Sequence, residues 1–306
     1  MTDDALMPPE VLPLDAVRPD RAFRVEAETA FLWFEPRGPV LMVSFDNLAT
    51  VDEPMPRAPW LGRHAAALGW SVLGLQSHAK DWYRQDRPGE MLDHLREAGF
   101  FDGFDTILFV GASMGGFAAL TLAPRVPGAR VLALSPQSTM NRDIAPFEGR
   151  FRWAVRNSDW SRPDGLDAAA AVAAIPAVTL AYDPFVPEDR AHALRLSGPN
   201  VQHVKLRHAT HEAVRVVLKA GAMGVMLDEM ARDGRLGAGF FEAMRGRRVV
   251  RKWARAFLDA VAARHDKLAL VAAEALLMQD DYLFAHRARA AVLERRPDLA
   301  RYIERA

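Results

Sequence analysis

The sequence predicts an α/β protein in which about eight mostly parallel strands carry helices on both faces, followed by a helical extension. From about residue 20 to residue 210, short apolar runs alternate with longer helical patterns. Most of these runs are nearly continuous in apolar residues, which is typical of strands covered on both faces. After residue 211 only helical periodicity continues. A chain of 306 residues, half of them hydrophobic, can bury one large core or one domain with a modest appendage.

The expected strands fall into two groups. The runs at 22–27, 30–35 and 39–45 lie close together, and we expect them to form an antiparallel meander. Each later run precedes or follows a helical stretch, which predicts parallel βα units. These later strands are expected at 70–75, 105–112, 130–136, 177–184 and 201–208, with helices at 57–69, 88–99, 115–124 and 187–196.

The change to helical periodicity predicts a first domain over residues 1–232 and a helical C-terminal extension over 233–306. The end of the extension resembles a tetratricopeptide repeat, although an ordinary hairpin of alanine-rich helices gives a similar pattern. A lone repeat cannot bury both of its faces, so we expect the extension to pack on its neighbours and to offer a surface for a protein partner. The residues that carry this resemblance are Ala272, Ala273, Asp281, Tyr282, Ala285 and Pro297.

Charge and composition narrow the function classes. Basic and acidic residues number 39 each, so no net field favours nucleic acid or an anionic membrane. The absence of cysteine excludes disulfides, thiolate catalysis and cysteine-ligated metals. The acidic, proline-bearing N-terminus lacks a signal-peptide pattern, and no apolar run is long enough to cross a bilayer. We therefore expect a cytoplasmic protein with no nucleic-acid or membrane partner.

The segment DTILFVGASMGGFAAL, residues 105–120, indicates a catalytic nucleophile. An apolar strand runs into Gly111-Ala112-Ser113-Met114-Gly115, and a helical pattern follows at once. In this context a G-x-S-x-G motif holds its serine at a strained tip, where the hydroxyl projects above the sheet. The glycines leave room for the strand and helix to converge. The turn also directs the backbone N–H of Met114 toward a developing oxyanion.

This strand, turn and helix resemble the nucleophile elbow of the α/β-hydrolase superfamily, over about residues 22–225. The superfamily places its acid and then its histidine after the nucleophile. The strand at 177–184 ends in Asp183, and Val186-Pro187 resembles the start of the next helix, so the resemblance implies Asp183 as the acid. Glu188 and Asp189 fall in the first turn of that helix, where we expect them to interact with the helix dipole.

The resemblance implies a histidine before the following helix, and His211 lies there. His208, nearer the end of the strand, is the alternative base. The two also read as H-x-x-H, but in an extended segment residues three apart point to opposite faces, and no further ligand set accompanies them. We therefore predict neither a metal nor another cofactor.

The second oxyanion donor is expected in the loop after residues 39–45, at Asp46 or Asn47. The superfamily often carries a glycine-bearing motif at this place, whereas residues 44–48 of this chain read Ser-Phe-Asp-Asn-Leu. The identity of that donor therefore stays open.

Two loops are candidates for substrate contact, because ligands bind at the carboxyl ends of the strands. The loop at 75–88 offers His78, Trp82 and Tyr83, and a lid-like segment at about 137–164 offers Arg152 and Trp153. Arginines on a lid also pack over aromatic rings without binding substrate, so that reading stays open.

The motifs predict a serine hydrolase that cleaves an ester or other acyl bond of a small molecule through an acyl-serine intermediate. An acyltransferase could use the same triad with a different acceptor. A third reading is a non-catalytic hydrolase-fold protein that binds a partner through its helical tail. The arginine-rich stretch at 244–257 is expected to be a solvated helix face, with an acidic partner or polyanion as the second interpretation.

Overall fold

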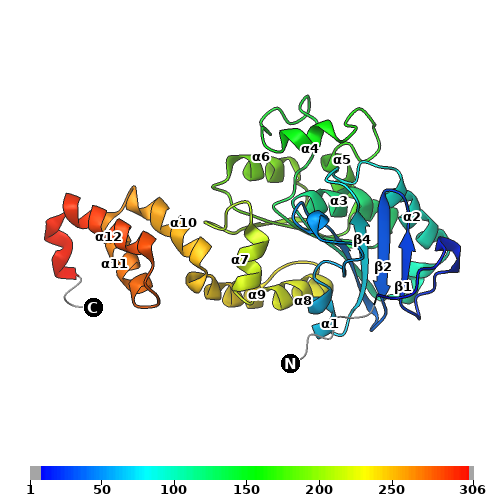
Figure 1. Cartoon of the computed structure of the whole chain (residues 1–306), viewed down its shortest axis with the longest axis horizontal. Helices are drawn as coiled ribbons and strands as arrows, with labels where there is room; N and C mark the ends of the chain where they lie inside the picture. The colour runs from blue at the N-terminus through cyan, green and yellow to red at the C-terminus, as the bar shows by residue number, and fades with distance from the viewer. Residues whose placement is uncertain (1–7, 303–306) are drawn as a thin grey trace.

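The computed structural model describes residues 8–302 and contains one eight-stranded sheet (Figure 1). Its strand order is β1-β2-β4-β3-β5-β6-β7-β8. The strands from β4 to β8 in this order run parallel, whereas β2 is antiparallel to both of its neighbours, β1 and β4. The strands are β1 (Phe23–Glu26), β2 (Ala30–Glu35), β3 (Val40–Phe45), β4 (Ser71–Ser77), β5 (Thr106–Ala112), β6 (Arg130–Leu134), β7 (Val178–Tyr182) and β8 (Val201–Lys205).

The predicted three-strand meander is wrong in one respect, because β4 lies between β2 and β3. β2 and β4 pair from Ala30 opposite Ser77 to Glu35 opposite Val72. All seven residues of β4 are buried, so this strand needs a neighbour along each edge. β4 therefore takes the place beside β2 that β3, the next strand in the sequence, was expected to occupy.

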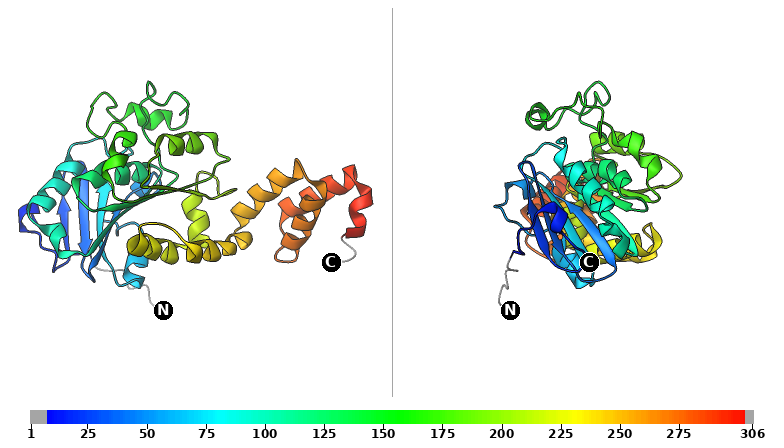
Figure 2. Two further views of the ribbon diagram at one scale, coloured as in Figure 1. Left: turned by 180° about the vertical axis from the view of Figure 1, so that it is seen from behind. Right: turned by 90° about the vertical axis from the view of Figure 1, so that its right-hand side faces the viewer.

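The helices cover both faces of the sheet (Figures 1 and 2). α2, α3 and α5 pack on one face, and α1, α7, α8 and α9 pack on the other. The helices in the sheet-containing part are α1 (Gly62–Ala67), α2 (Arg87–Glu97), α3 (Met114–Leu122), α4 (Arg152–Arg156), α5 (Ala168–Ala171), α6 (Pro187–Arg195), α7 (Ala213–Lys219), α8 (Met223–Asp233) and α9 (Ala238–Ala243). Short 3-10 turns complete it: η1 (Leu14–Ala16), η2 (Thr50–Asp52), η3 (Phe100–Gly103), η4 (Ala123–Arg125), η5 (Val172–Ala174) and η6 (Met244–Val249).

The sheet separates two hydrophobic cores. In β3, Leu41, Val43 and Phe45 belong to one core, and Met42 belongs to the other. This alternation follows from the two-residue repeat of a strand, which turns successive side chains to opposite faces. Because both faces are covered, the inner strands β3, β5 and β6 are mostly apolar.

The last helices form an arm that projects from the sheet-containing part (Figures 1 and 2). The arm comprises α10 (Arg251–Ala262), α11 (Asp266–Leu277), α12 (Leu283–Arg295) and η7 (Pro297–Tyr302). It has a core of its own, which includes Leu258, Ala273 and Ala285. The indole N–H of Trp253 donates to the Arg207 carbonyl over 2.8 Å and ties α10 to the end of β8.

Residues between the predicted boundary and the arm pack with the sheet. Leu236, Phe240, Met244 and Val250 are buried in the core that contains α7 and α8. The domain boundary at 232/233 and the tetratricopeptide-like character of the tail both stay predictions. Within residues 8–302, no helix has the length and apolar character needed to cross a bilayer.

Candidate active site

Ser113 occupies the sharp turn between β5 and α3 that the sequence predicts. Its backbone has φ 52° and ψ −116°, a strained conformation for a residue other than glycine. A Cβ at Gly111 would lie 2.0 Å from the Gly115 carbonyl oxygen, and one at Gly115 would lie 2.6 Å from the Asp46 carbonyl oxygen. Both glycines are therefore required for the strand and helix to meet at this angle.

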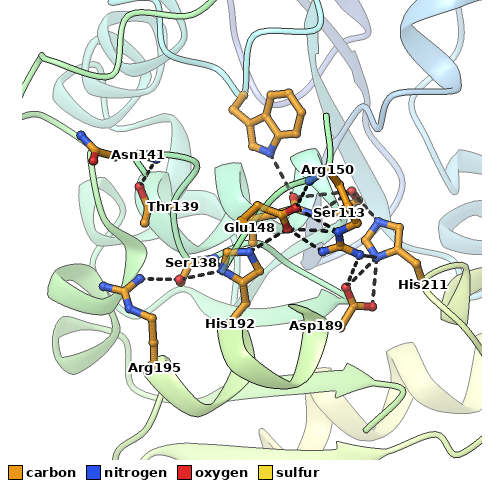
Figure 3. A network of polar contacts seen from close by, with 12 residues as sticks. Ser113, Ser138, Thr139, Asn141, Glu148, Arg150, Asp189, His192, Arg195 and His211 are labelled. Atoms are coloured by element: carbon orange, nitrogen blue, oxygen red, sulfur yellow. Dashed lines mark hydrogen bonds and ion pairs between the residues drawn. The ribbon is translucent and has the colours of Figure 1, made fainter. Parts of the chain in front are cut away.

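His211 connects Ser113 to a buried carboxylate (Figure 3). The Ser113 hydroxyl lies 3.0 Å from Nε2 of His211, so it can donate its proton to the ring. On the other side of the ring, Nδ1 lies 2.8 and 2.9 Å from the two carboxylate oxygens of Asp189. The Asp189 side chain is 1% exposed and that of His211 is 26% exposed. The order acid, histidine and serine is that of a hydrolytic triad.

The predicted contact between Asp183 and His211 is wrong. Both oxygens of the buried Asp183 carboxylate accept backbone hydrogen bonds, from the N–H of Phe185 over 3.0 Å and from that of Thr210 over 2.8 Å. Asp183 therefore holds the end of β7 against the loop that carries His211. Its oxygens are occupied by N–H groups instead of by the imidazole.

Asp189 is the carboxylate beside His211, and sequence reasoning did not single it out for that place. It lies in the first turn of α6, which begins at Pro187, and a carboxylate there commonly interacts with the helix dipole. Among the described residues its side chain instead contacts His211 and Arg150, both distant in sequence. No local pattern distinguishes such a residue from an ordinary first-turn acid, because its role depends on the position of the β8–α7 loop.

Arg150 from the lid-like segment shares the Asp189 carboxylate. One guanidinium nitrogen lies 2.9 Å from Oδ1 of Asp189 and 3.4 Å from Nδ1 of His211. Another lies 2.6 Å from Oε2 of Glu148. Burial alone would lower the pKa of Arg150, but the two carboxylates outweigh it and raise that pKa. The lid-like segment therefore places a half-buried cation directly beside Asp189 and His211.

The network continues from Glu148 into α6. The Ser138 backbone N–H donates to Nδ1 of the fully buried His192 over 3.1 Å, so the ring proton is on Nε2, which donates to Glu148 over 3.0 Å. Burial would raise the pKa of Glu148, but hydrogen bonds from His192 and Arg150 lower it from 4.5 to about 2. Figure 3 shows this chain of contacts between the lid-like segment and the residues around His211.

Gln137 lies on the other side of the Ser113 hydroxyl. Its amide oxygen accepts the indole N–H of Trp82 over 3.0 Å, and both side chains are fully buried. An indole only donates, so it fixes the oxygen of the amide toward Trp82 and the nitrogen toward Ser113. The amide nitrogen lies 3.1 Å from the Ser113 hydroxyl oxygen. A donor therefore faces the reacting atom.

The predicted oxyanion donors after β3 are occupied. The Asp46 N–H donates to the Tyr83 hydroxyl over 2.8 Å, and the Asn47 N–H donates to the Thr50 hydroxyl over 2.8 Å. These two predictions are therefore corrected, since neither N–H faces Ser113. For the Met114 N–H, at the start of α3, no acceptor is found among the described residues.

The Tyr83 side chain is buried and connects the ends of β3 and β4. Its hydroxyl, 2.9 Å from the Leu75 carbonyl oxygen, donates to it, and burial followed by the charge of Asp46 raises its pKa well above 10. Both hydrogen bonds of the Tyr83 hydroxyl go to backbone groups, and its predicted contact with substrate stays a prediction.

The other predicted contact residues differ in exposure. His78, Arg152 and Trp153 are exposed, and the Lys80 ammonium lies 5.5 Å from the Trp153 ring centroid. Trp82 is buried against Gln137. Their contact with substrate stays a prediction.

His208, the alternative base, packs in an aromatic cluster beside the helical arm. Its ring centroid lies 4.9 Å from that of Phe185 and 5.5 Å from that of Phe257. Across residues 8–302, no group of three or more histidine and carboxylate side chains is arranged to hold a metal ion.

Solved structures of similar shape share little sequence with this chain. The capsule O-acetyltransferase of Neisseria meningitidis serogroup A is 9% identical over 67% of this chain and 93% of that chain, with a TM-score of 0.46. MPT51 (FbpC1) of Mycobacterium tuberculosis is 17% identical over 66% and 94%, with a TM-score of 0.46. An S-formylglutathione hydrolase from Agrobacterium tumefaciens is 18% identical over 71% and 95%, with a TM-score of 0.42. No protein-family model matches the chain, and no curated protein matches its sequence.

The chain's own geometry identifies its fold. Strands follow the order 1-2-4-3-5-6-7-8 with the second reversed, and the strained serine lies between β5 and α3. The acid follows β7 and the histidine follows β8, as the order of the superfamily requires. This chain has the α/β-hydrolase fold.

Proposed function

We propose that this protein is a serine hydrolase that cleaves an ester or another acyl bond of a small molecule. The observation that carries the proposal is the continuous line of contacts from Asp189 through His211 to Ser113, with 2.8 Å and 3.0 Å at its two steps. An ordinary serine at a strand end requires neither a strained turn nor an imidazole oriented by a buried carboxylate.

In the proposed reaction, Nε2 of His211 takes the hydroxyl proton of Ser113 as the oxygen attacks the acyl carbon. The imidazolium then gives that proton to the leaving group, and an acyl-serine forms. A water molecule attacks the acyl carbon next, again losing a proton to His211. The Ser113 oxygen recovers the proton and the acid product leaves. Asp189 orients the ring and stabilises the imidazolium at both stages.

Two donors are proposed for the oxyanion. The Met114 N–H belongs to the first residue of α3, where the helix dipole favours negative charge. The Gln137 amide nitrogen already contacts the Ser113 oxygen, so a small shift brings it to the adjacent oxyanion. Trp82 limits the freedom of the amide, which is the preorganisation that such a donor needs.

Covalent labelling tests the proposal. A fluorophosphonate probe should label the wild-type protein, fail with Ser113→Ala, and react far more slowly with His211→Ala. Ser161→Ala is the matched control, because Ser161 is an exposed serine of the lid-like segment, and its labelling should equal that of the wild type. Absence of labelling in folded wild-type protein would overturn the proposal and favour the non-catalytic interpretation.

A further inference from the structure

A cavity of about 710 Å³ lies between the sheet-containing part and the helical arm. We call it the interdomain cavity. Its walls come from the end of β8, α7 and η6 on one side and from α10 and α11 on the other. This volume is within the range of small-molecule sites. Ser113 and Gln137 are not among its lining residues, so it is distinct from the candidate active site.

The interdomain cavity has a basic wall. Its described lining includes Lys205, Arg207, Arg245, Arg247 and Arg248 and no carboxylate. Arg245 pairs with an acidic residue outside the cavity, whereas the other four cations have no ion pair among the described residues. Of these four, Lys205, Arg207 and Arg248 are exposed and Arg247 is half-buried. A cation that loses water without gaining an anion is destabilised, and this cost falls on Arg247.

Arg247 shows this lack of compensation most clearly. Its guanidinium lies 5.2 Å from the Trp253 ring centroid, and it donates to the Met244 carbonyl over 2.7 Å. Burial, followed by the charge of the neighbouring Arg248, lowers the pKa of Arg247. An anion between these two guanidinium groups would compensate Arg247 for its lost water and would offset the repulsion between the two positive charges.

The rest of the lining is apolar. Met244 and Leu276 are buried, and Trp253 and Phe257 are half-buried with their rings stacked 5.1 Å apart. On the opposite wall, the small side chain of Ala272 on α11 leaves space in the cavity. Apolar side chains of this size beside unpaired arginines suit a ligand with one charged end and one hydrocarbon end.

We propose that the interdomain cavity binds a molecule with a single anionic head group, a carboxylate or a phosphate, and an apolar chain. Arg247 and Arg248 hold the head group, and the chain lies along Trp253, Phe257 and Leu276. Charge complementarity selects the head, and burial of hydrocarbon supplies the remaining affinity. The site requires no chemistry at Ser113.

The test measures binding by calorimetry on the full-length Ser113→Ala protein, so its result does not depend on the proposed hydrolase activity. The probes are decanoate and decyl phosphate, both below their micelle concentrations, with decanol and inorganic phosphate as the single-feature controls. We expect both amphiphilic anions to bind, and each control to bind roughly tenfold or more weakly. Comparing the two anions shows which head group the site prefers.

Two variants locate the site. Arg247→Ala with Arg248→Ala should weaken binding of both anions roughly tenfold or more, and Ala275→Trp should do the same by filling the cavity without changing its charge. Arg255→Ala is the matched control, because Arg255 is an exposed arginine of α10 that pairs with Asp259 and does not line the cavity. Circular dichroism checks that each variant is folded.

Several results would overturn the proposal. Absence of binding by both anions is one, and equal binding of decanol or of phosphate alone is another, because either would remove the need for one of the two features. Unchanged affinity in the double arginine variant or in Ala275→Trp would place the ligand elsewhere. Loss of labelling at Ser113 has no bearing on these outcomes, so the two proposals fail separately.

Discussion

Replacing Asp189 and Asp183 by asparagine, one at a time, tests which of them is the catalytic acid. Asp189→Asn keeps the size of the side chain but removes the charge beside Nδ1. Its amide nitrogen can then face the ring and stabilise the tautomer that carries its proton on Nε2. In that tautomer Nε2 cannot accept the proton of Ser113. Asp183→Asn makes the same chemical change at a buried carboxylate that contacts only backbone N–H groups among the described residues.

The structure sets different magnitudes for the two variants. Both oxygens of Asp189 lie within 2.9 Å of Nδ1. We therefore expect Asp189→Asn to lower kcat by about 10³–10⁴, a loss of about 4–5.5 kcal/mol of transition-state stabilisation. Asp183→Asn keeps one acceptor for two N–H donors, so it should cost about 1–3 kcal/mol of unfolding free energy. Its kcat should fall by about tenfold or less, through a loosened histidine loop.

Hydrolysis of a short-chain aryl ester gives kcat for the wild type and both variants, and thermal unfolding gives their stabilities. The expected pattern is a loss of kcat in Asp189→Asn that is at least a hundredfold larger than the loss in Asp183→Asn, with Asp183→Asn less stable than the wild type. The reverse pattern, with Asp189→Asn near wild-type turnover, would mean that His211 uses a different acid during the reaction. Equal kcat losses at unchanged stability would also contradict the assignment.

Three further predictions concern the turn, the oxyanion and the lid. Gly111→Ala should prevent soluble expression of folded protein, because its Cβ would meet the Gly115 carbonyl oxygen at 2.0 Å; a native circular dichroism spectrum would contradict this. Gln137→Ala should lower kcat by about 10²–10³ with little change in KM, whereas a purely structural role would lower stability and spare kcat. Glu148 has its pKa lowered from 4.5 to about 2, so its stabilisation is complete above pH 4.5 and is lost as the pH falls through 2. Glu148→Gln should therefore cost about 3 kcal/mol of unfolding free energy at pH 6 and much less near pH 2, and equal losses at both pH values would refute the argument.

Local signals were sufficient for most of the fold. The strand at 105–112 and the helix after it are predicted from apolar runs and from the crowding that only glycine relieves at Gly111 and Gly115, and the structure has both. The order of β3 and β4 in the sheet could not be read in this way. Strand order depends on which edges are free when the chain returns, and the sequence of an individual strand contains no record of that.

The carboxylate that contacts His211 was not identified from the sequence for a related reason. Asp183 and Asp189 both lie near the end of β7, and the sequence distinguishes them only by their distance from the strand. What separates them in the structure is the β8–α7 loop, which presents a backbone N–H to Asp183 and an imidazole to Asp189. The same holds for the oxyanion donor that was expected at Asp46. Tyr83, which follows a different strand, accepts the hydrogen bond of the Asp46 N–H, and the sequence near Asp46 does not indicate this contact.

In the proposed mechanism, the lid-like segment supplies two of the charged side chains around His211. Glu148 and Asp189 contribute two buried carboxylates, and Arg150 contributes one half-buried guanidinium, so these three side chains together carry a net charge of −1 beside the His211 ring. In the proposed mechanism His211 becomes an imidazolium at the moment of attack, and the group then becomes electrically neutral. Such a fixed arrangement favours the transition state over the resting state, since its dipoles and charges need no reorganisation when the proton arrives. Without Glu148, the charges of Arg150 and Asp189 would already sum to zero. Formation of the imidazolium would then leave a net positive charge, which would oppose the proton transfer from Ser113 to His211.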